Sequence, residues 1–211
     1  MAGSEHFFEF AHDLNLLHSA GIRIVLVHGS RPQIESQLAQ RNTKSRYHKG
    51  LRITDPIALE CVKEAVGLLR VEIDATLSQG LPNTPMAGAV INTASGNFIT
   101  AQPMGVLEGI DYQYTGTVRK IDTAAIQGCL EAGNIVIVSP IGYSPTGEVF
   151  NLAMEDVAVA TAKALRAEKL VFLSDQPVQD KKGVVLTELS AEEADKLLAR
   201  GKHLTSDTRL F

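Results

Sequence analysis

The stretch Ile22-Arg23-Ile24-Val25-Leu26-Val27-His28-Gly29-Ser30-Arg31-Pro32-Gln33 decides the fold, because an apolar run leads through a glycine turn into a helix start. It predicts a strand over residues 22–28 and a helix from about Pro32 to Arg41, since proline suits the first helical turn. Such a turn directs backbone N–H groups to one place, which suits an anionic ligand. Ser30 and Arg31, however, put side chains where a phosphate-binding loop usually has bare backbone. The stretch therefore predicts a nucleotide-type fold that no longer handles a nucleotide.

Helices and apolar strands alternate on both sides of this stretch. Apolar residues at helical spacing predict an amphipathic helix over residues 5–20, closed by Gly21, and a long helix that begins after the N-cap Asp55 and ends near Gly80. Further helices are predicted over 123–132 and 154–168, with apolar strands at 135–138 and 170–173 and a short strand ending at Asn151. This order predicts an α/β fold, a three-layer αβα sandwich with a mostly parallel central sheet.

Two segments interrupt this alternation. Residues 42–51 are polar and predict a loop. The turn 94–96 lies between extended residues 89–93 and 97–101 and, with a further extended piece over 112–118, predicts a β-hairpin insertion near 89–118. Near the C-terminus, Ser190 followed by acidic residues predicts one more helix start.

Composition and charge limit the class of protein. The 211 residues are 45% hydrophobic and 21% charged, which is typical of a globular protein. A formal charge of −4 argues against binding to nucleic acid or to an anionic membrane. Cys61 and Cys129 lack metal-type spacing, so we expect reduced cysteines. The sequence shows neither a signal peptide nor an 18-residue apolar run, and we expect a cytoplasmic protein without a metal site.

The turn His28-Gly29-Ser30-Arg31 is the first candidate site, because open α/β sheets place ligands at the carboxyl ends of their strands. An ordinary turn that uses Gly29 for its dihedral freedom is the alternative. Arg52, just before the capped helix, has a planar fork suited to the carboxylate of a small amino acid. The sequence leaves open whether Arg52 binds such a ligand or pairs with Asp55.

Two later strand ends also carry polar side chains. Asn151 follows a short strand and could hydrogen-bond a ligand, with Glu155 and Asp156 at the next helix start. Ser174 and Asp175 follow the last apolar strand and define a nucleotide-side edge. No Walker loop, GxSxG, HExxH or CxxC motif occurs, so the sequence gives no catalytic residue of those kinds.

Together these motifs resemble the amino acid kinase superfamily, and most of all its acetylglutamate kinase-like branch. The resemblance spans nearly the whole chain and rests on the ordered set Val27-His28-Gly29, Gly50-Leu51-Arg52-Ile53-Thr54-Asp55, Gly116-Thr117-Val118, Ser139-Pro140-Ile141-Gly142, Asn151 with Asp156, and Lys169-Leu170-Val171-Phe172-Leu173-Ser174-Asp175. Within the branch, Ser30 and Arg31 replace two glycines of a kinase, and Asn151-Leu152-Ala153-Met154-Glu155 lacks its second asparagine. At both positions the sequence resembles the bacterial N-acetylglutamate synthase family instead.

That resemblance implies a regulatory domain of an amino-acid N-acetyltransferase, which transfers acetyl from acetyl-CoA to L-glutamate and opens arginine biosynthesis. It implies arginine as effector and a homo-oligomer, with His28 to Arg31, Arg52 and Asn151 in an ancestral amino acid pocket. It also implies that residues 1–211 form a kinase-like domain incomplete at both ends, without its acetyltransferase domain and with no cofactor of its own. The alternatives are an acetylglutamate kinase that uses ATP and a stand-alone arginine-binding module.

Overall fold

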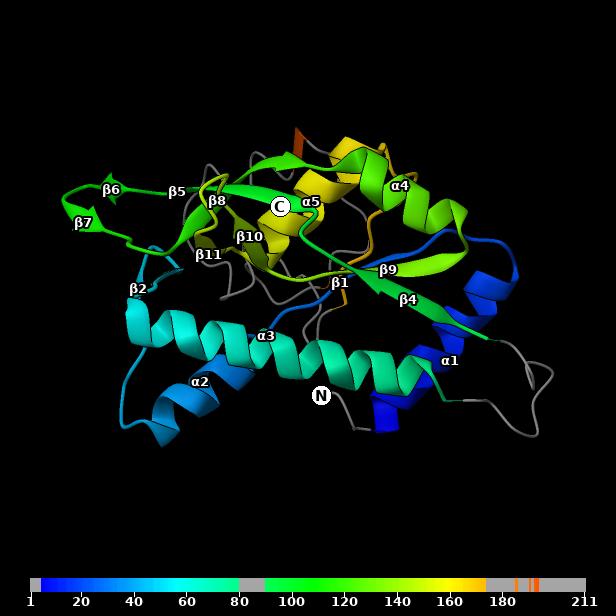
Figure 1. The fold of residues 1–211 in the computed structure, drawn as a ribbon, viewed down its shortest axis with the longest axis horizontal. Helices are drawn as coiled ribbons and strands as arrows, with labels where there is room; N and C mark the ends of the chain where they lie inside the picture. The colour runs from blue at the N-terminus through cyan, green and yellow to red at the C-terminus, as the bar shows by residue number, and fades with distance from the viewer. Residues whose placement is uncertain (1–4, 80–89, 174–184, 186–189, 191, 194–211) are drawn as a thin grey trace. The chain divides into compact units, whose positions relative to one another are not determined.

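The computed structural model describes residues 5–79, 90–173, 185, 190 and 192–193. The chain forms two compact units, residues 1–167 and 168–211. The first unit contains the fold predicted from the sequence (Figure 1). In the second unit, Ser190 and Glu193 form a capping box in which Ser190 N–H donates to the Glu193 carboxylate at 2.9 Å, as the predicted helix start requires.

Three helices lie in the N-terminal part of the chain. They are α1 (Glu5–Ser19), α2 (Arg31–Gln40) and α3 (Pro56–Leu77). Gly21 closes α1 with a φ of 86°, a conformation that glycine adopts without strain. Asp55 caps α3 by accepting the Ala58 N–H at 2.9 Å. The predicted boundaries of all three helices are confirmed to within three residues.

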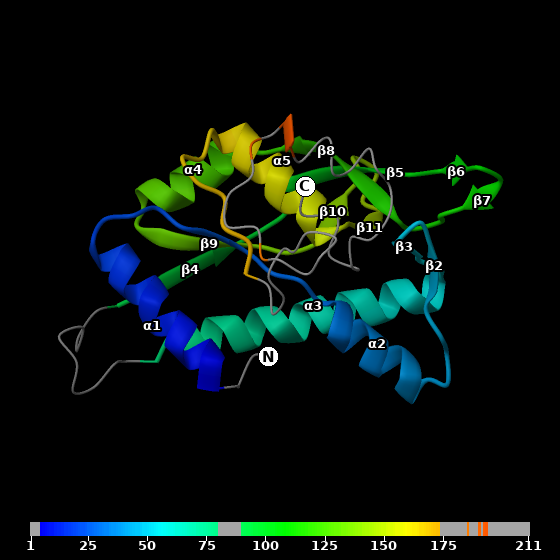
Figure 2. The ribbon, with the colours of Figure 1, turned by 180° about the vertical axis from the view of Figure 1, so that it is seen from behind.

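A three-stranded parallel sheet forms the middle layer, in the order β1-β9-β4. Its strands are β1 (Val25–Val27), β9 (Asn134–Val138) and β4 (Asn92–Ser95). Strand β9 is buried on both faces: Ile135 and Ile137 pack with α1 and α3, whereas Val136 and Val138 pack with the helices of the opposite layer. Those helices are α4 (Thr123–Glu131) and α5 (Met154–Leu165). Figures 1 and 2 show the sheet between the two helix layers, which confirms the three-layer α/β fold.

A second, mixed sheet continues from the first one. It has the order β11-β10-β5-β8 and consists of β11 (Val149–Asn151), β10 (Ile141–Tyr143), β5 (Ile99–Pro103) and β8 (Gly116–Ile121). Strands β5 and β8 are antiparallel, and β6 (Val106–Leu107) and β7 (Ile110–Asp111) form a small ribbon between them. The antiparallel pair of β5 and β8 lies in the region near 89–118 where the sequence predicted a β-hairpin insertion, but the ribbon of β6 and β7 was not predicted.

Three local predictions are wrong. Residues 94–96 do not close a hairpin: β4 pairs in parallel with β9, and β5 belongs to the second sheet, because the chain crosses between sheets at this glycine turn. The predicted polar loop instead forms β2 (Arg46–His48) and β3 (Leu51–Ile53), an antiparallel pair turned at Lys49 and Gly50. Residues 170–173 form no strand, and α5 ends at Leu165, before a left-handed Arg166.

Candidate functional site

His28 joins the carboxyl ends of the two neighbouring strands β1 and β9. Its backbone N–H donates to the Val138 carbonyl at 3.3 Å, and its Nε2 lies 2.9 Å from the Ser139 hydroxyl oxygen. The side chain is buried, and this burial lowers the pKa of His28, opposed in part by the hydrogen bond with the Gly29 carbonyl. His28 is therefore a neutral, hydrogen-bonded residue at the predicted sheet edge.

We expect His28 to make the protein less stable in mild acid. Because its folded pKa lies below the ordinary 6.5, the unfolded chain binds the proton more readily, and stability falls as the pH drops below about 6.5. Thermal melts at pH 7.5 and 5.5 should show a smaller loss of Tm in His28→Asn than in the wild type. His12→Asn, on α1, is the control for replacing a histidine elsewhere in the chain. An unchanged pH dependence in His28→Asn would contradict this assignment.

The rest of the turn differs from a bare phosphate loop. A Cβ at Gly29 would lie 3.9 Å from Met154 at the start of α5, an ordinary contact, and the φ of Gly29 is not in the left-handed region. The alternative that the turn needs Gly29 for its backbone dihedral freedom is therefore wrong. Ser30 is buried at the N-cap of α2, but its side chain caps no N–H group. The turn thus leaves first-turn N–H groups of α2 without a side-chain cap.

Arg31 and Arg52 converge on Tyr47, with guanidinium carbons 4.8 and 4.9 Å from the ring centroid. Glu35 accepts hydrogen bonds from Arg52 Nη2 at 2.9 Å, from the Tyr47 hydroxyl at 2.5 Å and from the Ser45 hydroxyl at 2.8 Å. We call these five residues the Tyr47 cluster. It shows that β2, β3 and α2 are held together by one buried arginine and one carboxylate.

The partner of Arg52 is therefore Glu35. The suggested pair with Asp55 is wrong, because Asp55 caps α3 and lies 3.4 Å from Arg46. Burial by itself would raise the pKa of Glu35, but hydrogen bonds from Tyr47 and Ser45 and the charge of Arg52 hold that pKa below its ordinary value. Among the described residues, Arg31 pairs with no carboxylate and has the Tyr47 ring as its contact.

Asn151 connects to Arg52 through two buried threonines. Asn151 Nδ2 donates to the Thr54 hydroxyl oxygen at 3.0 Å, and the hydroxyl oxygens of Thr54 and Thr115 lie 2.8 Å apart. The Thr115 hydroxyl also donates to the Arg52 carbonyl at 2.6 Å. Two predicted site residues are thus brought into one hydrogen-bonded network. Thr54 and Thr115 were not predicted, although Thr54 follows Arg52 closely in the motif Gly50–Asp55.

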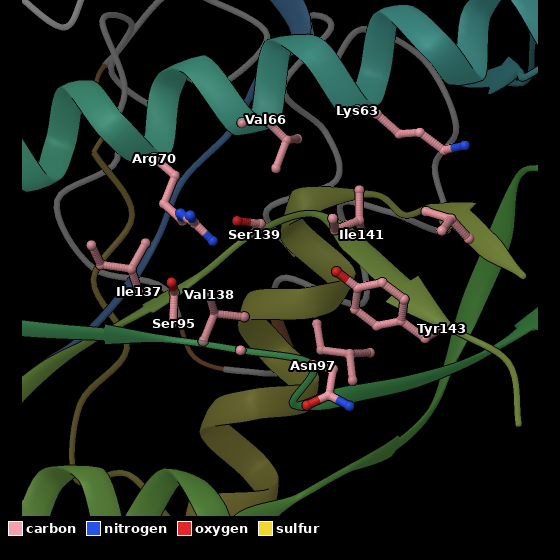
Figure 3. Close-up of a pocket in the computed structure, with 14 residues that line it drawn as sticks. Lys63, Val66, Arg70, Ser95, Asn97, Ile137, Val138, Ser139, Ile141 and Tyr143 are labelled. Atoms are coloured by element: carbon pink, nitrogen blue, oxygen red, sulfur yellow. The ribbon is translucent and has the colours of Figure 1, made fainter. Parts of the chain in front are cut away.

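A cavity of about 400 Å³ lies between α3 and the carboxyl ends of β4 and β9 (Figure 3). Lys63 and Arg70 line it from α3, and Ser139 lines it from the end of β9. Ser139 is also the partner of His28, so the cavity adjoins the predicted turn. The sequence analysis missed Lys63 and Arg70, although they lie seven residues apart on one helix, a spacing that places both on the same face. Ser174 and Asp175 lie outside the described residues.

An α/β fold with these polar residues at strand ends is the architecture on which amino acid kinases are built. The profile of the amino acid kinase family matches residues 1–209, and this chain belongs to that family.

The curated relatives point to one branch of this family. The chain is 54% identical over 200 residues to the amino-acid acetyltransferase of Ralstonia nicotianae, covering 94% of this chain and 44% of that protein. It is 52% identical over 196 residues to the amino-acid acetyltransferase of Pseudomonas syringae pv. syringae, covering 92% of this chain and 45% of that protein. The chain therefore spans about half the length of the relatives it matches.

Solved structures agree with these relatives. The N-acetylglutamate synthase of Neisseria gonorrhoeae complexed with coenzyme A and L-arginine matches with a TM-score of 0.87 at 37% identity, over 96% of this chain and 47% of that one. The same enzyme complexed with coenzyme A and N-acetyl-glutamate gives 0.84 at 38% identity, over 96% of this chain and 46% of that one.

No described helix is both long and apolar enough to cross a membrane. In the same part of the chain, no three His, Cys, Asp or Glu side chains are grouped so that they could hold a metal ion.

Proposed function

We propose that residues 1–211 are the amino acid kinase-like regulatory domain of an N-acetylglutamate synthase, the enzyme that transfers acetyl from acetyl-CoA to L-glutamate. The observation that carries this proposal is the 54% identity to an amino-acid acetyltransferase across nearly the whole chain. In this proposal the chain's own residues do not bind acetyl-CoA, because none resembles the pyrophosphate loop of an acetyltransferase. Acetyl-CoA is then a substrate held outside residues 1–211.

The geometry of the candidate site supports a regulatory role over phosphoryl transfer. A phosphate approaching the turn after β1 meets Ser30 and Arg31 instead of bare glycine backbone. The fork of Arg52 is already engaged by Glu35 and stacked on Tyr47. In the ancestral pocket of His28 to Arg31, Arg52 and Asn151, the guanidinium of Arg52 thus already has partners within the chain.

Arginine is the proposed effector. An effector that binds the less active arrangement of the enzyme more tightly shifts the population towards it and lowers activity. The structural relative complexed with L-arginine supports this choice. We also propose a cytoplasmic homo-oligomer: the exposed Leu68 and Val71 on α3 offer apolar surface to a second copy, and both cysteines are free.

The test uses the intact protein and two assays. Acetyl transfer from acetyl-CoA to L-glutamate should be measurable and should fall by about tenfold in millimolar L-arginine, within the usual range of allosteric coupling. Incubation with ATP and N-acetyl-L-glutamate should yield no acyl phosphate, detected as its hydroxamate. Formation of the hydroxamate would overturn the proposal and identify an acetylglutamate kinase. Arginine-dependent stabilisation without either activity would identify a stand-alone arginine-binding module.

A further inference from the structure

The cavity beneath α3 is lined by positive charge and therefore does not suit arginine as a ligand. Lys63 and Arg70 both line it, and its lining includes no Asp or Glu. Within the described part of the chain, neither cation pairs with a carboxylate. Two unneutralised cations around one cavity repel a guanidinium and attract an anion.

Along the cavity, the cation of Lys63 is followed by an apolar wall and then by the cation of Arg70. Figure 3 shows Lys63 and Arg70 leaving α3 on either side of Val66. Seven residues of helix separate the two cations, a rise of about 10 Å. On the sheet side, Ile137 and Ile141 provide apolar wall. A ligand that matches this order carries an anionic group at each end of a short apolar body.

Polar groups for orientation come from the ends of the parallel strands. Ser95 ends β4, Asn97 follows it, and Ser139 follows β9, and all three line the cavity. Hydroxyl and amide groups of this kind donate hydrogen bonds to carboxylate oxygens. The volume of about 400 Å³ is that of a small-molecule site. The site also lies where open α/β sheets place their ligands.

Gly67 lines the cavity without a side chain. It lies in the interior of α3, where glycine weakens a helix, and it lines the cavity between the two cations. A Cβ at Gly67 would meet no atom within 4 Å. A side chain placed there would therefore project into free space and would not strain the helix.

From these observations we propose that the cavity bounded by Lys63, Gly67, Arg70, Ser95 and Ser139 is a binding site for a small dicarboxylate. The two carboxylates bind to Lys63 and Arg70, and the apolar body lies against Val66. Charge-assisted hydrogen bonds of this kind are about twice as strong as neutral ones, so loss of one cation weakens binding sharply.

The probe is glutarate, titrated calorimetrically into the intact protein, with uncharged glutaramide as the matched ligand control. Glutarate should bind saturably, and glutaramide should bind at least about tenfold more weakly. Hydrogen exchange should show protection of residues 63–70 by glutarate. Equal binding of glutaramide, or of inorganic phosphate, would overturn the dicarboxylate assignment, as would the absence of saturable glutarate binding.

Three variants locate the site. Arg70→Gln should weaken glutarate binding by about tenfold or more, and Gly67→Leu should abolish it by placing a side chain in the cavity. Arg119→Gln removes an exposed cation on β8, away from the cavity lining, and should leave binding unchanged. Circular dichroism and thermal melts confirm that each variant is folded. Wild-type binding in folded Arg70→Gln would overturn the proposal, and so would an equal loss in Arg119→Gln.

Discussion

Gly116→Ala should destabilise the first unit by about 3 kcal/mol, at the upper end of the usual cost of overpacking. An added Cβ would lie 2.7 Å from Phe150 Cβ and 2.8 Å from the Gln102 carbonyl oxygen. Neither atom belongs to the far end of a flexible side chain, so β8 itself has to move. Thr115 precedes Gly116 and bonds to Thr54, and the same movement breaks the network that holds Asn151. Urea denaturation followed by circular dichroism measures the loss.

Gly128→Ala is the matched control for this substitution. Gly128 lies in α4, and a Cβ there would meet no atom within 4 Å. Alanine is favoured over glycine in a helix interior by about 1 kcal/mol, so this variant should be as stable as the wild type or more so. Equal urea midpoints for the two variants would show that β8 tolerates a Cβ and would contradict the steric argument.

Periodicity predicted the helices and the buried strand β9 because each of these elements carries its own signal. The N-caps Asp55 and Asp122 and the apolar run of β9 are local features of the sequence. The choice of which strands pair with each other, in contrast, depends on residues far apart in the sequence. Residues 89–101 have the pattern of a hairpin, but β4 pairs in parallel with β9, and β5 belongs to the second sheet. The strands β2 and β3 are only three residues long each, and contacts of Tyr47 and Arg52 with Glu35 on α2 stabilise the pair.

The candidate site was predictable only in part, for the same reason. The position of His28 at a strand end follows from one apolar run, and the structure confirms that position. The partner of Arg52 was not predictable, because Glu35 lies 17 residues earlier on another element. Lys63 and Arg70 carry no motif, and they line a cavity only because α3 packs above the strand ends. Ligand binding by His28, Gly29, Ser30, Arg31, Arg52 and Asn151 stays a prediction.

Glu35→Gln should lower the free energy of unfolding by about 2 kcal/mol, because it leaves the guanidinium of Arg52 buried without a counter-charge. Breaking a fully buried pair costs about 3–5 kcal/mol. The Arg52 side chain is 6% exposed but that of Glu35 is 42% exposed, so solvent screening reduces the effect. Because the folded pKa of Glu35 is lowered, the stabilisation is complete above its ordinary pKa of 4.5 and is lost as the pH falls through the folded value. The denaturation curves of the wild type and Glu35→Gln should therefore differ at pH 7 and converge in acid.

Two further variants separate the buried charge from a general surface effect. The pair Arg41–Glu64 is 36% and 50% exposed at its side chains, so Glu64→Gln should cost clearly less stability than Glu35→Gln. Adding Arg52→Met to Glu35→Gln removes the orphaned charge and should recover part of the lost stability in a double-mutant cycle. Equal losses for Glu35→Gln and Glu64→Gln would show that Arg52 does not depend on Glu35. Its fork would then be free to exchange that carboxylate for one carried by a ligand.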